Sequence, residues 1–228
     1  MKRSRVNEIM AEAETFIASF GFALPPFAGW SAAAFQARRV AAARIIEARL
    51  GWDITDYGQG DFDRLGLFLF TLRNGRLAEL QRGGGMAYAE KLLISRQDQI
   101  SPMHTHALKV EDIINRGGAT LAVELHGSDP SGQFDEGAGG VVECDGLARR
   151  FAPGEVLRLT PGESVTLRPG DWHAFWGEGG DVLIGEVSTV NDDETDNIFR
   201  ERIGRFAQIE EDAEPRHLLV SDYAAWLS

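Results

Sequence analysis

The sequence Pro102-Met-His-Thr-His-Ala-Leu-Lys-Val-Glu111 contains two histidines, His104 and His106, that are separated by one residue. On a β-strand, residues two apart point to the same face. Two imidazoles on one face can hold a divalent metal ion, although a His-x-His pair taken alone is more often structural. The pair therefore needs further ligands from elsewhere in the chain before it predicts a metal site.

Glu111 is a third candidate ligand, and it follows His106 after a short apolar and basic stretch. Strict strand alternation would place Glu111 on the opposite face, unless the chain changes phase at a bulge or bend around residues 107–108. A change of phase at that point would also bring Lys109 to the inner face.

Short β-type runs, separated by turn residues at intervals of about ten, fill the chain from residue 61 onward. They lie at residues 66–72, 87–95, 120–126, 141–143, 156–159, 164–167 and 181–188. Gly117-Gly118 is expected to end the strand that carries Glu111 before the run at 120–126 begins. No helical pattern intervenes that could carry crossovers between parallel strands, so the pattern predicts an all-β sandwich or barrel.

Two helices are predicted ahead of the β-rich region. Residues 4–20 carry apolar side chains at spacings of three and four, and Gly21 follows as a stop signal. Ser31 is the expected N-cap of a second helix, which extends through an alanine- and arginine-rich segment to about Leu50.

The chain has 228 residues, which is long enough for one large domain or for two small ones. We expect residues 1–60 to form a helical segment packed on a barrel of residues 61–228, together one structural domain. The polar run at 128–140 could link two domains. A loop inside one barrel is the simpler interpretation, because strand-like segments continue on both sides.

Composition narrows the range of partners and compartments. The 23 Lys and Arg residues against 35 Asp and Glu residues give a net charge of −12, which repels nucleic acids and anionic lipid surfaces. The single cysteine, Cys144, cannot form an intramolecular disulfide, and no apolar run is long enough to cross a bilayer. We therefore expect a cytoplasmic protein with no nucleic-acid or membrane partner.

The motif around His104, continued to Gly118, resembles the first motif of the cupin superfamily. The stretch Gly162-Glu-Ser-Val-Thr-Leu-Arg-Pro-Gly-Asp-Trp-His173 resembles the second motif, with its proline one position later than usual. The resemblance implies a mainly β fold, a cupin-type antiparallel β-barrel (jelly roll) with N-terminal helices. It also implies one metal ion bound by His104, His106, Glu111 and His173. This donor set suits Mn²⁺, Fe²⁺, Co²⁺, Ni²⁺ or Zn²⁺, whereas His126 and His217 are expected to be structural.

A wider resemblance covers most of the chain and points to the D-lyxose isomerase family of cupins. It is carried by Lys2-Arg-Ser4, Leu24-Pro-Pro-Phe27, Trp52-Asp-Ile-Thr-Asp-Tyr-Gly58, Glu90-Lys-Leu92, Glu111–Gly118 and Gly185–Asp193. It implies reversible interconversion of D-lyxose with D-xylulose, and of D-mannose with D-fructose, with one divalent metal, commonly Mn²⁺. The likeness to cupins also implies a homodimer. Residues 31–50 are less typical of the family and are interpreted as an insertion.

An isomerase of this kind must move a proton between C1 and C2 of a free sugar, through a cis-enediol. We expect Lys109 to be the acid/base group, with a pKa lowered by burial and a nearby cation. Its carboxylate counterpart is to be found among Glu186, Asp192, Asp193, Glu210 and Glu211, from which Glu211 is chosen as the catalytic partner. Lys91, Glu186 and Asp193 are expected to bind substrate.

Two other functions remain compatible with the same motifs. The metal site could hold a sugar without converting it, in a sensing or binding cupin, or it could belong to an Fe(II) dioxygenase. The acidic net charge and the absence of a glycine-rich phosphate cradle favour an unphosphorylated sugar as the substrate.

Overall fold

The computed structural model describes residues 1–227. The helices are α1 (Arg3–Ser19), α2 (Ala32–Ala37), α3 (Ala43–Glu47), α4 (Leu77–Leu80) and α5 (Tyr223–Trp226), with a 3₁₀ helix, η1, at Pro26–Gly29. The strands are β1 (Gly51–Thr55), β2 (Leu67–Asn74), β3 (Tyr88–Ser95), β4 (Ser101–His106), β5 (Glu111–Ser128), β6 (Phe134–Asp135), β7 (Gly140–Cys144), β8 (Leu147–Phe151), β9 (Glu155–Leu159), β10 (Ser164–Leu167), β11 (Trp172–Thr189) and β12 (Asn197–Phe199).

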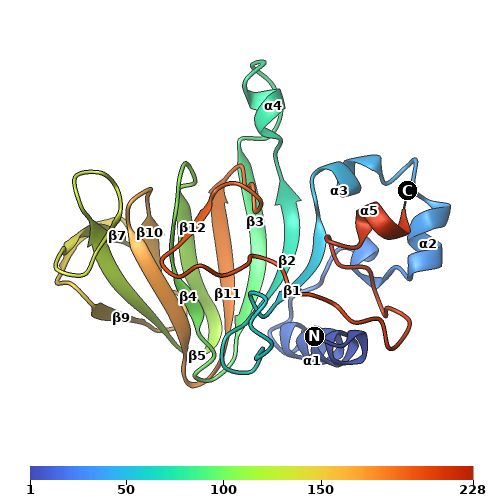
Figure 1. Cartoon of the computed structure of the whole chain (residues 1–228), viewed down its shortest axis with the longest axis horizontal. Coiled ribbons are helices and arrows are strands. Elements are labelled where there is room, and N and C mark those ends of the chain that lie inside the picture. Colours follow the sequence, from blue (N-terminus) through green and yellow to red (C-terminus); the bar gives the residue numbers. More distant parts are fainter. Residues whose placement is uncertain (228) are drawn as a thin grey trace.

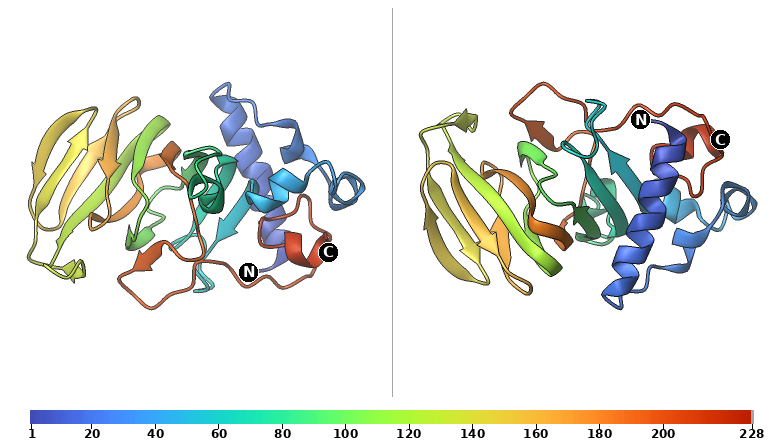
Figure 2. Two further views of the ribbon diagram at one scale, coloured as in Figure 1. Left: turned by 90° about the horizontal axis from the view of Figure 1, so that it is seen from above. Right: turned by 90° about the horizontal axis from the view of Figure 1, so that it is seen from below.

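These strands form the expected mainly β, antiparallel barrel, with the N-terminal helices at one side (Figures 1 and 2). The barrel is built around two long strands, β5 and β11, of 18 residues each. The first half of β11 pairs with β4 and with the second half of β5, whereas the second half of β11 pairs with β3 and with the first half of β5. A cluster of buried aliphatic side chains fills the interior, including Leu121, Val123, Leu157 and Val182.

Gly117 and Gly118 do not end a strand, so that part of the sequence-based prediction is wrong. Both residues lie inside β5, at φ values of 150° and 96°, and the pairing of β5 with β11 shifts register there. A Cβ atom on Gly118 would lie 2.3 Å from the carbonyl oxygen of Asp181. The glycines therefore let one strand bend and continue instead of stopping it.

Helix α1 forms where the apolar stripe predicts it. Its buried residues, among them Val6, Ile9 and Ile17, pack against Phe68 and Phe70 on the outer side of the sheet. The helix ends before Gly21, whose φ of 70° suits the turn that follows.

The second predicted helix is broken into two short ones, α2 and α3. The Ser31 hydroxyl caps α2 as expected, by accepting a hydrogen bond from the Ala34 N–H at 3.2 Å. The break after Ala37 lets Phe35 and Ala42 share one small cluster with Leu218 and Tyr223 from the end of the chain. Tertiary packing thus outweighs the helix propensity of this alanine-rich segment.

Strand β1 was not predicted, and it lies within residues 1–60, where only helices were expected. It pairs with β2 over its whole length and extends the sheet at the edge nearest α1. The polar run at 128–140 folds back on the barrel, because β6 pairs with Gly127 and Ser128 at the end of β5.

After β11 the chain returns across the barrel instead of leaving it. Strand β12 pairs with β4, and Asn197 lies opposite His106 in that ladder. The chain then runs back to α1, where Glu210 pairs with Lys2. Figure 1 shows this orange to red segment passing in front of the strands on its way to the C-terminal end.

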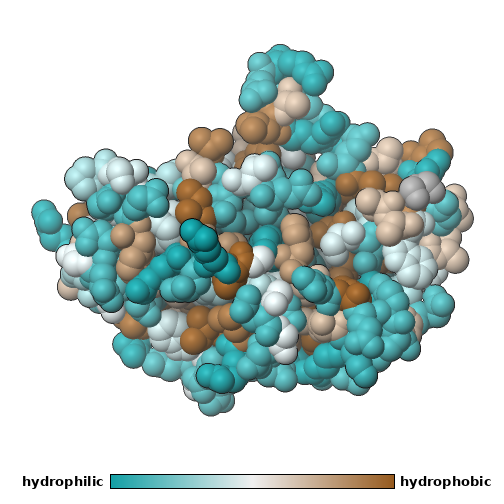
Figure 3. Space-filling model, viewed as in Figure 1, coloured by the Kyte–Doolittle hydropathy of each residue, from teal (hydrophilic) through white to brown (hydrophobic). Residues whose placement is uncertain are grey.

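The face seen in Figure 1 is mainly hydrophilic, with apolar side chains scattered over it (Figure 3). Within residues 1–227, no helix has the length and apolar character that a membrane crossing requires.

Candidate metal centre and active site

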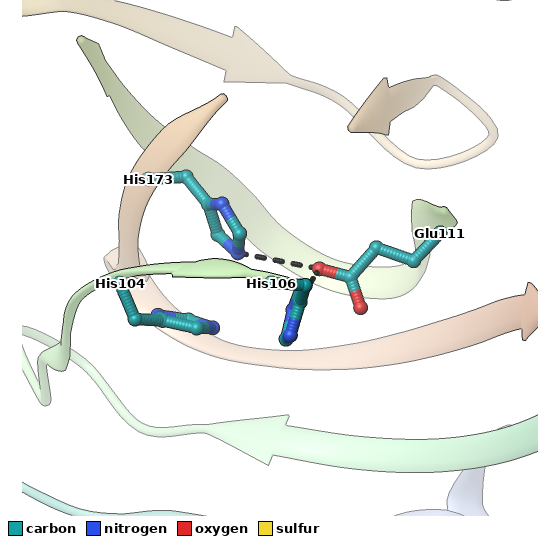
Figure 4. A group of neighbouring side chains, drawn as sticks. All are labelled: His104, His106, Glu111 and His173. Carbon is teal, nitrogen blue, oxygen red and sulfur yellow. Dashed lines mark hydrogen bonds and ion pairs between the residues drawn. The ribbon is translucent and has the colours of Figure 1, made fainter. Parts of the chain in front are cut away.

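Four side chains from three strands converge inside the barrel. Strand β4 supplies His104 and His106, β5 begins with Glu111, and β11 supplies His173, which lies opposite His104 in the ladder. One candidate ligand atom from each of the four lies within 4.8 Å of the others, and all four residues are buried. Figure 4 shows the imidazoles of His106 and His173 and the carboxylate of Glu111 directed toward one another. The structure therefore brings together all four ligands implied by the motifs.

The expected change of phase lies in the loop between β4 and β5, at residues 107–110. Lys109 and Glu111 both turn inward, and the Lys109 Nζ atom lies 2.6 Å from Glu111 Oε2. This resolves the conflict between strand alternation and the position of Glu111.

The arrangement of the imidazole nitrogens fits a metal ion. The Nδ1 atom of His104 donates to the Pro102 carbonyl oxygen at 2.7 Å, and that of His173 donates to the Asp171 carbonyl oxygen at 3.0 Å. These bonds leave the Nε2 atoms of both rings for the cluster. The buried His173 Nε2 atom lies 3.2 Å from Glu111 Oε1 (Figure 4) and makes no well-formed hydrogen bond among the described residues. A buried nitrogen with a free lone pair, beside a carboxylate, is what a divalent metal requires.

Electrostatics favour the neutral, metal-binding form of His104 and His106. Burial lowers the pKa of His104 well below 6.5, and the neighbouring His173 and His106 lower it further. Burial and the charge of Lys109 likewise lower the pKa of His106. These two imidazoles are therefore available at neutral pH as ligands of a divalent transition metal.

Next to this cluster lies a row of buried charges of alternating sign. The Lys109 ammonium lies 3.0 Å from Glu186 Oε1, and the Lys91 ammonium lies 3.4 Å from the same oxygen. Lys91 is also 3.4 Å from Asp193 Oδ1 and donates to the Asn191 side-chain oxygen at 2.8 Å. Three residues expected to contact substrate, Lys91, Glu186 and Asp193, thus lie in one network with Lys109.

The expected lowering of the Lys109 pKa is wrong, because the surroundings of the ammonium raise the pKa instead. Burial alone would lower this pKa, but the attraction of Glu111 and Glu186 outweighs burial and raises it above the usual lysine value. The expected shift assumed a nearby cation, whereas the ammonium contacts two carboxylates. Lys109 is therefore a charged hydrogen-bond donor in this setting.

Residues that sequence reasoning missed complete the cavity. Tyr57, Asn197, Phe199 and Arg205 line it together with the charged row. The Arg205 Nη2 atom lies 2.7 Å from Asp53 Oδ2 and 3.3 Å from Asp193 Oδ1, while its Nη1 atom is buried without a hydrogen-bond partner among the described residues. The sequence could have indicated a role for Asp53, because a carboxylate between Trp52 and Ile54 in a buried strand needs a partner of opposite charge. No sequence pattern indicated Arg205, because it lies outside any regular element.

Comparison with known proteins assigns the family. A sequence model of the D-lyxose isomerase family matches residues 1–223. The D-lyxose/D-mannose isomerase of Serratia proteamaculans is 48% identical over 231 residues, which cover 100% of both chains. The protein of the same description from Escherichia coli O157:H7 is 43% identical, with 98% of both chains covered. The chain belongs to the D-lyxose isomerase family. It is accordingly an aldose–ketose isomerase, which confirms the expected class of enzyme over a sugar-binding cupin or a dioxygenase.

Solved structures support the fold of this D-lyxose isomerase family member. A variant of the L-ribose isomerase of Acinetobacter sp. DL28, in complex with L-ribose, superposes with a TM-score of 0.62 over 92% of this chain and 98% of that one, at 14% identity. The L-ribose isomerase of Cellulomonas parahominis gives a TM-score of 0.57 over the same shares, at 17% identity. At this level of identity the likeness concerns the fold alone.

Glu211 does not belong to the cavity of this family member, so its choice as the catalytic partner of Lys109 needs correction. Its half-exposed carboxylate lies 2.7 Å from the Nη2 atom of Arg3, a buried residue that also pairs with Asp222. Glu211 therefore fastens the C-terminal segment to α1. Sequence alone could not rank the carboxylates after Ser188, because their places depend on how that irregular segment folds.

The two remaining histidines also lie outside the cluster. His126 pairs with Glu124 at 3.0 Å, and His217 stacks on Trp52 and bonds to Glu14. Both have the structural surroundings that their sequence positions indicated.

Proposed function

We propose that this enzyme interconverts D-lyxose with D-xylulose, and D-mannose with D-fructose, as free sugars. The observation that carries the proposal is full-length similarity to two D-lyxose/D-mannose isomerases, joined to a buried His–Glu cluster beside an acid/base pair. The acidic net charge of −12 supports an unphosphorylated substrate.

The metal would be held by His104, His106, Glu111 and His173, and Mn²⁺ is our proposal for its identity. When bound, a divalent ion supplies Lewis-acid stabilisation of negative charge that develops on the sugar oxygens. The oxygens on C1 and C2 of the sugar are the atoms whose developing charge such an ion would stabilise.

Glu186 replaces Glu211 as our candidate for the base that moves the carbon-bound proton. Its carboxylate is buried, lies in the cavity wall, and is held by Lys109 at 3.0 Å and Lys91 at 3.4 Å. In the aldose-to-ketose direction, Glu186 takes the proton from C2 and returns it to C1 on the same face, through a cis-enediol. The hydroxyl proton moves from O2 to O1 in the same sequence, so the atoms balance.

Lys109 has a different role in this proposal. Its ammonium donates a hydrogen bond to the oxygen on which charge develops and can pass the hydroxyl proton between O2 and O1. At the other side of the cavity, Lys91, Asp193 and the free Nη1 donor of Arg205 are proposed to bind the sugar hydroxyls farther from C1.

The proton-transfer proposal is tested by running the reaction in D₂O. Deuterium should appear at C1 of the ketose, partly diluted by return of the original proton. Glu186→Gln should lower both turnover and deuterium exchange by about 10²-fold or more while the metal content stays unchanged. A product free of deuterium would indicate hydride transfer instead, and normal turnover in Glu186→Gln would remove Glu186 from the mechanism.

We also propose a homodimer and a cytoplasmic location, on the likeness to cupins and the single cysteine. Light scattering on the purified protein tests the first of these, with twice the mass of the chain as the expected result.

A further inference from the structure

Asp196 lies at the point where the segment after β11 meets the loop between β4 and β5. Its buried side chain accepts hydrogen bonds from two successive backbone N–H groups, Leu108 at 2.7 Å and Lys109 at 3.1 Å. Its own carbonyl oxygen accepts a third, from Ala107 at 3.0 Å. One residue therefore binds three consecutive N–H groups of the loop that turns Lys109 and Glu111 inward.

The same carboxylate faces His106. Strand β12 begins with Asn197 opposite His106, so Asp196, one residue earlier, comes beside that ring. Its Oδ2 atom lies 3.8 Å from His106 Nδ1. This distance is longer than a hydrogen bond, but Nδ1 is buried and has no other partner among the described residues.

The three histidines of the cluster differ in this respect. The Nδ1 atoms of His104 and His173 are each fixed by a backbone carbonyl, two residues earlier in the chain. His106 presents Nε2 toward Glu111 Oε1, at 3.1 Å, and its outer nitrogen, Nδ1, faces Asp196 Oδ2 at 3.8 Å. An imidazole that binds metal through Nε2 carries its proton on Nδ1, and a buried N–H of that kind needs an acceptor.

We propose that Asp196 is a positioning residue that accepts the Nδ1 proton of His106, fixes this histidine as a metal ligand, and ties it to the loop that carries Lys109. The inference rests on the proposed metal site. It deepens the proposed function by giving the segment after β11 a role in metal binding as well as in lining the cavity.

The test compares two Asp→Asn variants of the full-length protein, both in the same segment. Asp196→Asn should weaken Mn²⁺ binding about 10- to 100-fold, the effect usual for loss of a carboxylate that orients a metal-binding histidine. Asp192→Asn is the matched control, because Asp192 is exposed and accepts hydrogen bonds only within the segment, from Glu194 N at 3.0 Å and Thr195 Oγ1 at 2.7 Å. Its Mn²⁺ affinity should change less than about 3-fold.

Calorimetric titration of the metal-stripped proteins with Mn²⁺ gives these affinities, and saturating Mn²⁺ should return most of the lost turnover in Asp196→Asn. Equal affinity in Asp196→Asn and the wild type would overturn the inference and leave the proposed function intact, as would equal weakening in both variants. Absence of Mn²⁺ binding by the wild-type protein would instead overturn the metal site itself.

A measurement on the wild-type chain keeps the inference testable if Asp196→Asn does not fold. In Zn²⁺-loaded, ¹⁵N-histidine-labelled protein, NMR should show His106 protonated at Nδ1, with slow solvent exchange because the proton is buried and bonded. A deprotonated or rapidly exchanging Nδ1 would contradict the role of Asp196.

Discussion

The charges in the cavity form one connected row, in which each group lies next to groups of opposite sign. From Arg205 the row passes through Asp193, Lys91, Glu186 and Lys109, and from there to the metal-ligand candidate Glu111. Buried charges persist only when they are paired, since an isolated one costs several kcal/mol. Each member therefore holds its neighbours in place, and a substrate hydroxyl entering the row meets donors and acceptors that are already oriented.

Lys109 gives the sharpest test of that row. Lys109→Met should lower kcat by about 10²-fold or more. The variant lacks the ammonium that stabilises the developing charge on the sugar oxygen and transfers the hydroxyl proton. The matched control is Lys2→Met, since Lys2 is exposed and far from the cavity along the chain, and it should keep normal turnover. Metal content is measured in parallel, and near-normal kcat in Lys109→Met with metal bound would exclude Lys109 from catalysis.

The histidines predict how stability depends on pH. The pKa values of His104 and His106 are lowered in the folded protein from the ordinary 6.5, so below about pH 6.5 the unfolded chain binds more protons than the folded one. The free energy of unfolding of metal-stripped protein should fall below that pH, by up to about 1.4 kcal/mol per pH unit for each histidine. Urea unfolding at about pH 7.5 and about pH 5.5 measures the difference. The difference should be smaller in His104→Gln, and a constant or rising free energy on acidification would contradict the prediction.

At this scale the sequence predicts the metal cluster better than the catalytic groups. Strand periodicity places only His104 and His106 on one face, and the resemblance of two short motifs to those of cupins implies Glu111 and His173 as the other ligands. Glu186 is buried because it lies in the 18-residue strand β11, and the hydrophobic pattern of the sequence does not reveal the bend of that strand. Arg205 and Asp196 depend on the path of an irregular segment, for which no periodicity exists to be read.

Among the elements, the two long strands position the site. Strand β5 carries Glu111 at its start and β11 carries both His173 and Glu186, at opposite ends of its bend. Because of the bend near Gly118, β5 and β11 each contribute residues to both walls of the barrel. The predicted runs match these strands only in halves, because the glycines that bend them are also typical of turns. Strand β10, which is straight and bounded by turns, agrees with its prediction at both ends.

Gly118→Ala should show the importance of the bend. At a φ of 96° a Cβ is strained, and here it would also approach the Asp181 carbonyl oxygen to 2.3 Å, so the free energy of unfolding should fall by about 1–3 kcal/mol or more. Gly162→Ala separates the two causes, because its φ is 101° and nothing lies within 4 Å of the added atom. Urea unfolding of both variants measures their free energies of unfolding. Equal decreases in the two variants would mean that backbone strain alone accounts for the effect.

Across the whole molecule, α1 and the C-terminal segment are fastened together at one side of the barrel (Figure 1). The segment after β11 supplies Asp193, Asn197 and Arg205 to the cavity, and then docks on α1 through the buried Arg3. Sequence patterns predicted α1, but not that its first residue, Arg3, would anchor this segment, since pairing between residues about 200 apart leaves no local signal.

We propose that the His–Glu cluster makes this chain a metal-dependent isomerase of free D-lyxose and D-mannose. The most direct measurement is the conversion of D-lyxose to D-xylulose by protein stripped with EDTA and then titrated with Mn²⁺. Activity should be absent after stripping and should return as about one ion per chain binds, and His106→Ala should need far more Mn²⁺ because one of four ligands is missing. Full activity in stripped protein, or no conversion with Mn²⁺ or any other divalent transition metal, would contradict the claim.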